Sequence, residues 1–159
     1  MRKFATFIAS FSLILTLLSC SLEENTPSPY AKVLGEWTLV KFATPIGTIE
    51  PAVGLGYVEK YVFKEDGTFL KIVEISGGEV GPARVKQASG TFLESGEYDG
   101  VELALVLTFD TNKSMAATCD PYEEEYVGLK LDGYLTNFTW AACDGLGYIY
   151  ARSGVDSGS

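Results

Sequence analysis

The side chains that could carry out chemistry are few, because the 159-residue sequence contains no histidine. Catalysis by Ser-His-Asp or Cys-His arrangements is therefore excluded, and so is the commonest metal ligand among side chains. Carboxylates remain, and Glu94 with Glu97, or Asp120 with Glu123, could form a glycosidase pair. Such a pair needs carboxyl groups roughly 5 to 9.5 Å apart across a cleft. Because acidic loops exposed to solvent explain both pairs, we expect no enzymatic activity and no catalytic residues.

A run of glutamates, Glu123 to Glu125, follows Asp120 closely and could offer the oxygen ligands that calcium prefers. The sequence here lacks the alternating ligand spacing and the central glycine of a calcium loop. The glycines near residues 54 and 77 do not precede helical patterns, so they do not indicate a phosphate-binding loop. We therefore expect neither a metal site nor a cofactor.

The N-terminus has the layout of an export signal. Arg2 and Lys3 precede an apolar stretch, residues 4–18, which is shorter than the ~20 residues that a membrane-spanning helix needs. The tetrapeptide at 17–20, Leu-Leu-Ser-Cys, resembles the lipobox of bacterial lipoproteins. The resemblance implies that residues 1–19 are a signal peptide and that Cys20 becomes the lipid-bearing first residue. The alternative is an ordinary secretory signal, which would leave Cys20 as a third cysteine able to form a disulfide.

A diacylglycerol and an acyl chain on Cys20 would anchor the protein stably to a membrane without crossing it. We therefore expect a lipid-anchored protein of the outer membrane, on the periplasmic side or at the cell surface. Glu23 and Glu24 resemble the acidic signal that sends some lipoproteins to the surface, although they also suit a solvated tether.

The charge of the mature chain limits its partners. Removal of Arg2 and Lys3 with the signal leaves ten basic and twenty-one acidic residues, a net charge of −11. Nucleic acids need a basic surface, and anionic lipids attract basic segments. We therefore expect no nucleic-acid partner and no membrane contact except through the lipid.

With Cys20 lipidated, Cys119 and Cys143 are left as an even pair in an oxidising compartment. A disulfide between them would close a loop of about 25 residues and contribute roughly 3 kcal/mol in the chain-entropy model. Neither cysteine has a basic neighbour in sequence or a Cys-x-x-Cys spacing that would indicate a redox site. We expect a structural disulfide.

Short apolar or alternating runs separated by turn residues predict a single all-β domain at 33–152. A flexible tether at 20–32 precedes it, and a disordered tail at 153–159 follows it. Asp66-Gly67 predicts a tight hairpin, and Gly90 predicts a bulge or kink. The expected strands are 34–42, 57–64, 68–75, 84–94, 101–109, 126–131, 134–140 and 147–152, with 112–118 as a possible ninth.

Eight or nine short antiparallel strands favour a closed barrel, because closure removes the unpaired edges of an open sheet. A β-sandwich is the alternative that the same pattern allows. An eight-stranded barrel has an interior that holds either side chains or one small ligand.

Gly35-Glu36-Trp37, in the first expected strand, resembles the Gly-x-Trp motif of lipocalins. The segment 63–69, Phe-Lys-Glu-Asp-Gly-Thr-Phe, is similar to a motif of lipocalin-like domains on bacterial lipoproteins. The resemblance implies a lipocalin-like barrel whose base is closed by Arg152 lying across Trp37, an interaction worth ~0.5 to 2 kcal/mol. The central Thr-Asp-Tyr motif of typical lipocalins is missing from the sequence, so their ligands are not implied.

Aromatic side chains are the main candidate ligand surface, although the alternative is that most of them fill the core. We expect a monomer that binds a small apolar or aromatic molecule in its barrel. The alternative is a surface protein that binds a protein or glycan partner through loops 43–56 and 76–83, with the barrel as a scaffold. The candidate ligand-binding residues are Tyr57, Tyr61, Phe63, Tyr134, Phe138, Trp140, Tyr148 and Tyr150.

Overall fold

The computed structural model describes residues 28, 30–77, 81–119 and 123–154. The expected signal peptide, Cys20, Asp120 and residues 155–159 of the expected tail lie outside these ranges. Within the described ranges, no helix has the length and hydropathy needed to cross a membrane.

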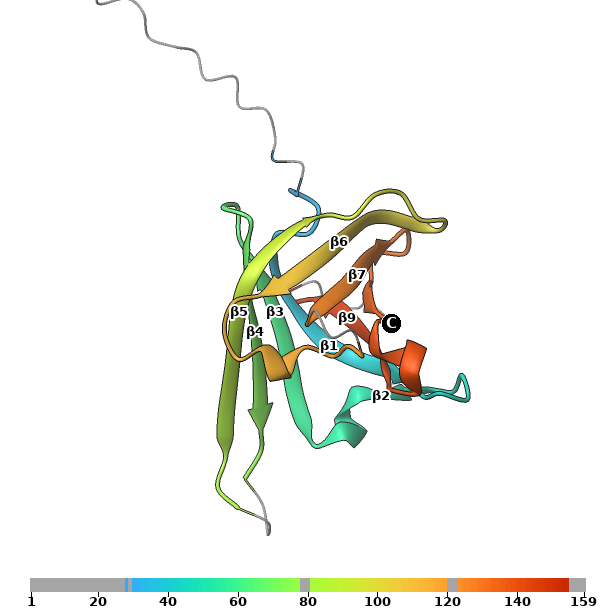
Figure 1. Cartoon of the computed structure of the whole chain (residues 1–159). Coiled ribbons are helices and arrows are strands. Elements are labelled where there is room, and N and C mark those ends of the chain that lie inside the picture. The colour runs from blue at the N-terminus through green and yellow to red at the C-terminus, as the bar shows by residue number, and fades with distance from the viewer. Residues whose placement is uncertain (1–27, 29, 78–80, 120–122, 155–159) are drawn as a thin grey trace, which may run out of the picture.

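The described chain forms one antiparallel sheet that closes on itself (Figure 1). Neighbouring strands pair in the order β2-β1-β3-β4-β5-β6-β7-β8-β9, and β1 also pairs with β9. This last pairing makes an eight-stranded barrel, with β2 added outside it, and excludes the sandwich alternative. The strands are β1 (Gly35–Ala43), β2 (Ile49–Pro51), β3 (Tyr57–Phe63), β4 (Thr68–Ile75), β5 (Arg84–Glu94), β6 (Val101–Phe109), β7 (Glu124–Lys130), β8 (Leu135–Asn137) and β9 (Gly147–Arg152).

The predicted hairpin at Asp66-Gly67 is confirmed. Gly67 has φ of +78°, which L-residues with a side chain rarely adopt. The Asp66 carboxylate accepts hydrogen bonds from the Thr68 backbone N–H at 3.0 Å and the Thr68 hydroxyl at 2.6 Å. These bonds fix the turn, so that β3 and β4 pair in register from Tyr57 opposite Ile75 to Phe63 opposite Phe69.

The ninth strand is not where the sequence predicted it. Residues 112–118 form the 3₁₀ helix η3 (Lys113–Met115) and an irregular segment, so the prediction of a strand there is wrong. Asn112 has φ of +45°, a left-handed conformation that breaks an extended chain. The additional strand is β2, within the stretch expected to be the 43–56 loop, and the 3₁₀ helix η2 (Ala52–Leu55) follows it.

Gly90 does not hold a bulge, since the pairing of β5 with β4 and β6 is continuous through it. A Cβ at this position would lie 2.0 Å from the Thr108 carbonyl oxygen and 2.8 Å from the Phe69 ring. The glycine therefore permits a close approach of backbone and ring inside the barrel. Register shifts occur elsewhere, between Leu39 and Lys41 in β1 and between Val101 and Leu103 in β6.

One half of the barrel is filled by aromatic side chains. Phe63 and Phe92 pack edge to face with ring centroids 5.1 Å apart, and Tyr30 covers Phe92 at 4.9 Å. Phe69 and Phe109 form a similar pair at 5.0 Å. Interdigitated rings of this kind stabilise a core beyond the area that they bury. This half is therefore a core of packed, buried rings.

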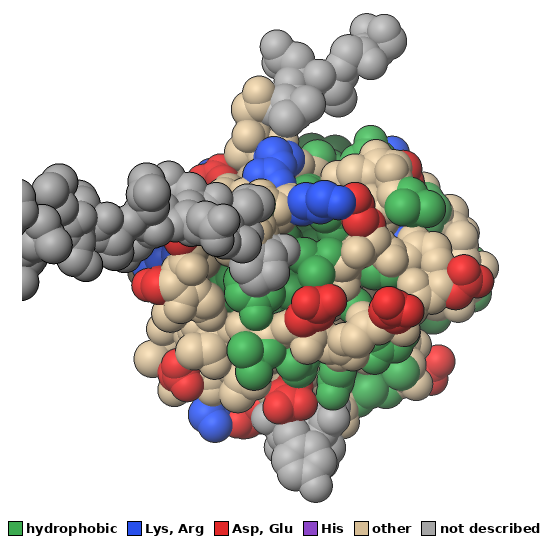
Figure 2. Space-filling model, turned by 90° about the horizontal axis from the view of Figure 1, so that it is seen from above, with side chains coloured by type: hydrophobic (Ala, Val, Ile, Leu, Met, Phe, Trp, Pro, Cys, Tyr) green, Lys and Arg blue, Asp and Glu red, His purple; other side chains and the backbone are tan. Residues whose placement is uncertain are grey.

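The filled half is closed at its end by the chain that enters the barrel. The Trp37 indole N–H donates to the Val33 carbonyl oxygen at 2.7 Å, and both side chains are buried. The Arg152 guanidinium lies 4.6 Å from the Trp37 ring and donates to the carbonyl oxygens of Lys32 and Leu34. Figure 2, seen from above this end, shows charged side chains of both signs with hydrophobic ones between them.

Candidate functional site

The opposite end of the barrel contains a cavity of about 410 Å³. β4 and β5, which contribute Val73, Ile75 and Lys86 to its walls, extend beyond the other strands at the lower end of Figure 1. Ligand pockets generally measure ~300 to 1,000 Å³, so this cavity suits a small molecule. Its walls are Tyr57, Glu59, Lys71, Val73, Ile75, Lys86, Ser114, Met115, Ala116, Ala117, Thr118, Trp140 and Tyr148.

A buried charged cluster lies at the inner end of the cavity. The Lys71 ammonium is 2.7 Å from Glu125 Oε1 and 3.3 Å from Glu59 Oε1, and all three side chains are at most 6% exposed. The Tyr150 hydroxyl donates to Glu59 Oε1 at 2.6 Å, and the Tyr61 hydroxyl donates to Glu125 Oε2. Buried charges are stable when they are paired and hydrogen-bonded in this way.

The backbone also supports the cluster. The Ala117 N–H donates to Glu125 Oε1 at 2.5 Å, so the irregular segment after η3 is tied directly to the charged groups. That segment forms one wall of the cavity. The position of the wall therefore depends on the Glu125 carboxylate.

The pKa values in the cluster follow from burial and from the neighbouring charges. Burial alone would lower the pKa of Lys71. The negative charge of Glu125, together with Tyr61 and Glu59, outweighs burial, so the pKa of Lys71 is raised well above its usual value. Burial, followed by the nearby Glu125 carboxylate, raises the pKa of Tyr61. Burial, followed by the nearby Glu59 carboxylate, also raises the pKa of Tyr150. Lys71 therefore stays charged and both phenols stay neutral at physiological pH.

Two further phenols line the cavity. The Tyr57 hydroxyl donates to the Tyr148 hydroxyl across 3.4 Å, a long hydrogen bond. Burial is the main influence on both phenols, and it raises the pKa of Tyr57 and of Tyr148. The hydrogen bond between them is the second influence: it lowers the pKa of Tyr57 and raises the pKa of Tyr148. They present neutral groups that can donate and accept hydrogen bonds.

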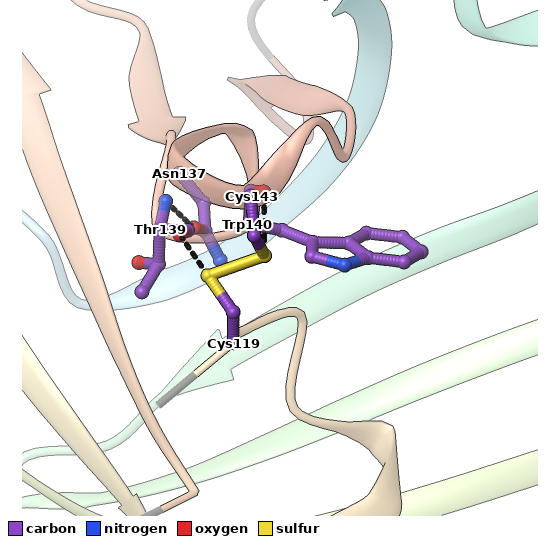
Figure 3. The surroundings of a disulfide bond; sticks show 5 residues. All are labelled: Cys119, Asn137, Thr139, Trp140 and Cys143. Carbon is purple, nitrogen blue, oxygen red and sulfur yellow. Dashed lines mark hydrogen bonds between the residues drawn. A yellow bond between two sulfur atoms is a disulfide. The ribbon is translucent and has the colours of Figure 1, made fainter. Parts of the chain in front are cut away.

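The expected disulfide between Cys119 and Cys143 is confirmed, with Cα atoms 6.2 Å apart. Figure 3 shows the bond joining the segment before Cys119 to the 3₁₀ helix η4 (Trp140–Cys143), with the Trp140 indole extending away from the sulfurs. Residues 116–118 and Trp140 both line the cavity. The disulfide therefore holds two walls of the cavity together.

The eight candidate ligand-binding residues fall into three groups. Tyr57, Trp140 and Tyr148 line the cavity. Tyr61, Phe63 and Tyr150 are almost fully buried beside or beyond the charged cluster. Tyr134 and Phe138 are not among the lining residues.

Tyr134 and Phe138 lie outside the barrel because β8 turns the odd-numbered positions inward. Leu135 and Asn137 are fully buried there, whereas Phe138 is 44% exposed. Tyr134 packs under the Lys41 ammonium at 5.3 Å from the ring centroid. Phe138 instead lines a groove of about 470 Å³ on the outer surface, together with Tyr98 and Tyr126.

Sequence analysis missed the charged cluster, although strand alternation carried a signal for it. Glu59 lies two residues before the buried Tyr61 in β3, and Glu125 lies two residues before the buried Val127 in β7. Lys71 likewise lies two residues after the buried Phe69 in β4. Successive side chains alternate between the faces of a strand, so all three charges could have been assigned to the interior.

Of the acidic residues considered for catalysis, the three that the structure describes lie at the surface. Glu94 and Glu97 are exposed, and Glu123 pairs with Lys113 at 3.3 Å on the surface. Within the described ranges, no group of three or more cysteine or acidic side chains is arranged to hold a metal ion.

The described chain is a closed eight-stranded antiparallel barrel with one filled half and one open end. No model of a known protein family matches the sequence, and no curated protein matches it. The geometry of the cavity therefore carries the functional argument.

Proposed function

We propose that this protein binds a small, largely aromatic molecule in the cavity at the open end of its barrel. The single observation that supports this most directly is the cavity of about 410 Å³ with Tyr57, Tyr148 and Trp140 in its walls. Aromatic walls with a few fixed polar groups are typical of small-molecule sites. The filled half of the barrel and the disulfide keep these walls in place without the ligand.

We further propose that the protein is a lipocalin-like lipoprotein of the outer membrane, anchored through Cys20. Tyr30 packs on Phe92 at the closed end, opposite the cavity. A lipid attached ten residues before Tyr30 would therefore tether the closed end and leave the cavity directed away from the bilayer. Labelling with a radioactive fatty acid tests the anchor: the wild type should be labelled and Cys20→Ser should not. An unlabelled wild type would contradict the anchor.

Binding in the cavity can be tested with the neutral dye N-phenyl-1-naphthylamine, whose fluorescence rises in an apolar site. We expect saturable binding at one site per protein. Val73→Trp places an indole in the cavity and should weaken binding at least tenfold. Val58→Trp, on the outer face of β3, is the matched control and should leave binding unchanged. Binding that does not saturate, or that survives Val73→Trp, would overturn the proposal.

A second candidate function is protein binding through the segment between β1 and β3. Ile46 and Val53 are each 89% exposed there, and Ile49 is 52% exposed. Exposed aliphatic side chains this close together in sequence favour a contact surface over a purely solvated loop. If this surface binds a partner, cross-linking on cells should capture it with the wild type and lose it with the double substitution Ile46→Ser and Val53→Ser. Recovery of the same cross-linked species with the double variant would exclude this surface.

A further inference from the structure

Two carboxylates inside the barrel share a single ammonium. Glu59 and Glu125 both face Lys71, and their other described partners are the neutral donors Tyr61, Tyr150 and the Ala117 N–H. Every described partner of the two carboxyl groups is thus a hydrogen-bond donor. By formal charge, two carboxylates face one ammonium, so the lysine balances only one of them.

The excess charge is nearest the cavity at Glu59. Glu125 takes the shorter contact with Lys71, 2.7 Å against 3.3 Å, and uses both of its oxygens as acceptors. Glu59 uses Oε1 for Lys71 and for Tyr150, while Oε2 has no hydrogen-bond partner among the described residues. Glu59 also lines the cavity and is 5% exposed. Among the described residues, the only fully buried side-chain polar atom without a hydrogen-bond partner is Asn137 Nδ2, so Glu59 Oε2 can be reached from the cavity. An ammonium group of a ligand would form a charge-assisted hydrogen bond with this oxygen.

The other groups around the cavity are compatible with a cation at Glu59. Tyr57, Tyr148 and Trp140 line the cavity, and the faces of aromatic rings attract cations. Lys86 is the remaining charged lining residue, and it is exposed, so solvent and salt screen its charge. The protein as a whole carries a formal charge of −9, which also favours the approach of cations.

We propose that the cavity selects a protonated amine carried on a planar aromatic group. The ammonium donates to Glu59 Oε2 and neutralises the excess charge of the cluster, and the aromatic group lies among Tyr57, Tyr148 and Trp140. This inference rests on the proposed function, because it assigns the ligand class of the same cavity.

Calorimetric titration of the mature protein with three indoles of similar size tests the charge preference. Tryptamine is a cation at pH 7, tryptophol is its neutral alcohol, and indole-3-propanoate is an anion. We expect tryptamine to bind at least tenfold more tightly than tryptophol, and the anion to bind most weakly. Equal affinities for tryptamine and tryptophol would overturn the amine preference while leaving the proposed function intact. Failure of all three indoles and of the naphthylamine dye would overturn the proposed function itself.

A substitution of Glu59 then locates the preference. In Glu59→Gln, tryptamine affinity should fall to about the affinity of the same variant for tryptophol. Glu74→Gln removes the same charge from an exposed position on β4 and should change neither affinity. Retention of the tryptamine preference in Glu59→Gln would overturn the assignment. If Glu59→Gln does not fold, the comparison of the two ligands on the wild type still decides the proposal.

Discussion

Lys71 and Glu125 form an ion pair of 2.7 Å in the interior of the barrel, where neither side chain is more than 1% exposed. The lysine comes from β4 and the glutamate from β7, so the pair connects opposite walls. Lys71 Nζ also lies 5.1 Å from the centroid of the Tyr61 ring. The stability of the barrel and the shape of its cavity therefore depend on the same residues.

Replacement of Lys71 by methionine should destabilise the protein strongly. The substitution leaves two buried carboxylates without a cation, and loss of one partner of a buried pair costs about 3 to 5 kcal/mol. Urea unfolding followed by circular dichroism measures this change. Lys64→Met, at an exposed position after β3, is the control and should change stability by less than about 0.5 kcal/mol. Equal stabilities of the two variants would show that the pair does not stabilise the barrel.

Stability should fall at alkaline pH because of the buried phenols and Lys71. The pKa values of Tyr61, Tyr150 and Lys71 are raised in the folded state. These three groups therefore contribute fully to the free energy of unfolding below their pKa values in the unfolded chain, which are about 10 to 10.4. The contribution is lost as the pH rises from there toward the pKa values of the folded state. We expect a constant urea midpoint from pH 7 to about pH 9.5 and a steady decrease above it.

The double variant Tyr61→Phe and Tyr150→Phe should show a shallower alkaline decrease, because two of the shifted groups are gone. In the wild type, absorbance at 295 nm should show that Tyr61 and Tyr150 do not ionise until the protein unfolds. Ionisation of all nine tyrosines near pH 10 in the folded protein would contradict the burial of these phenols.

Removal of the disulfide by Cys119→Ser and Cys143→Ser should cost roughly 3 kcal/mol for a closed loop of this length. Because the bond joins two walls of the cavity, dye affinity should fall as well. Both cysteines are exposed, so a reducing agent should lower the melting temperature of the wild type and leave that of the double variant unchanged. A wild type that is insensitive to complete reduction would show that the bond has no structural role.

Arg152→Lys should destabilise the closed end of the barrel by about 1 to 2 kcal/mol. Lysine lacks the forked donors that reach two carbonyl oxygens and the flat group that lies on Trp37. Chemical unfolding monitored by tryptophan fluorescence provides the measurement. Arg84→Lys, at an exposed position of β5, is the matched control and should have little effect. If both arginine variants unfold at the same denaturant concentration as the wild type, the contact with Trp37 contributes nothing.

Alternation and turn residues predicted much of this fold. Four strands, 68–75, 84–94, 101–109 and 147–152, have the predicted bounds, and the closed barrel follows from the strand count. The prediction was wrong at 112–118, where tertiary contacts of Ala117 and Asn112 hold an irregular segment. Local alternation does not report such contacts.

The site was less accessible to sequence analysis than the fold. Tyr57, Tyr148 and Trp140 were chosen for their aromatic rings, and these three residues do line the cavity. Sequence analysis expected Phe138 to face the interior, but this side chain lies on the outer surface. The expected strand 134–140 is reduced to the three residues of β8, and η4 begins at Trp140. Glu59 and Lys71 lie on the two strands of one hairpin, but Glu125 is 54 residues after Lys71, so the pairing of Lys71 with Glu125 needed the closed barrel.

The central claim is that the open end of the barrel binds a small aromatic molecule, and amide chemical shifts test it most directly. Isotope-labelled protein should be titrated with N-phenyl-1-naphthylamine and, separately, with tryptamine, and its amide resonances followed. The account predicts saturable shifts concentrated at Tyr57, Ser114 to Thr118, Trp140 and Tyr148. Resonances that move with neither ligand, or shifts concentrated around Tyr98 and Phe138 on the outer surface, would contradict it.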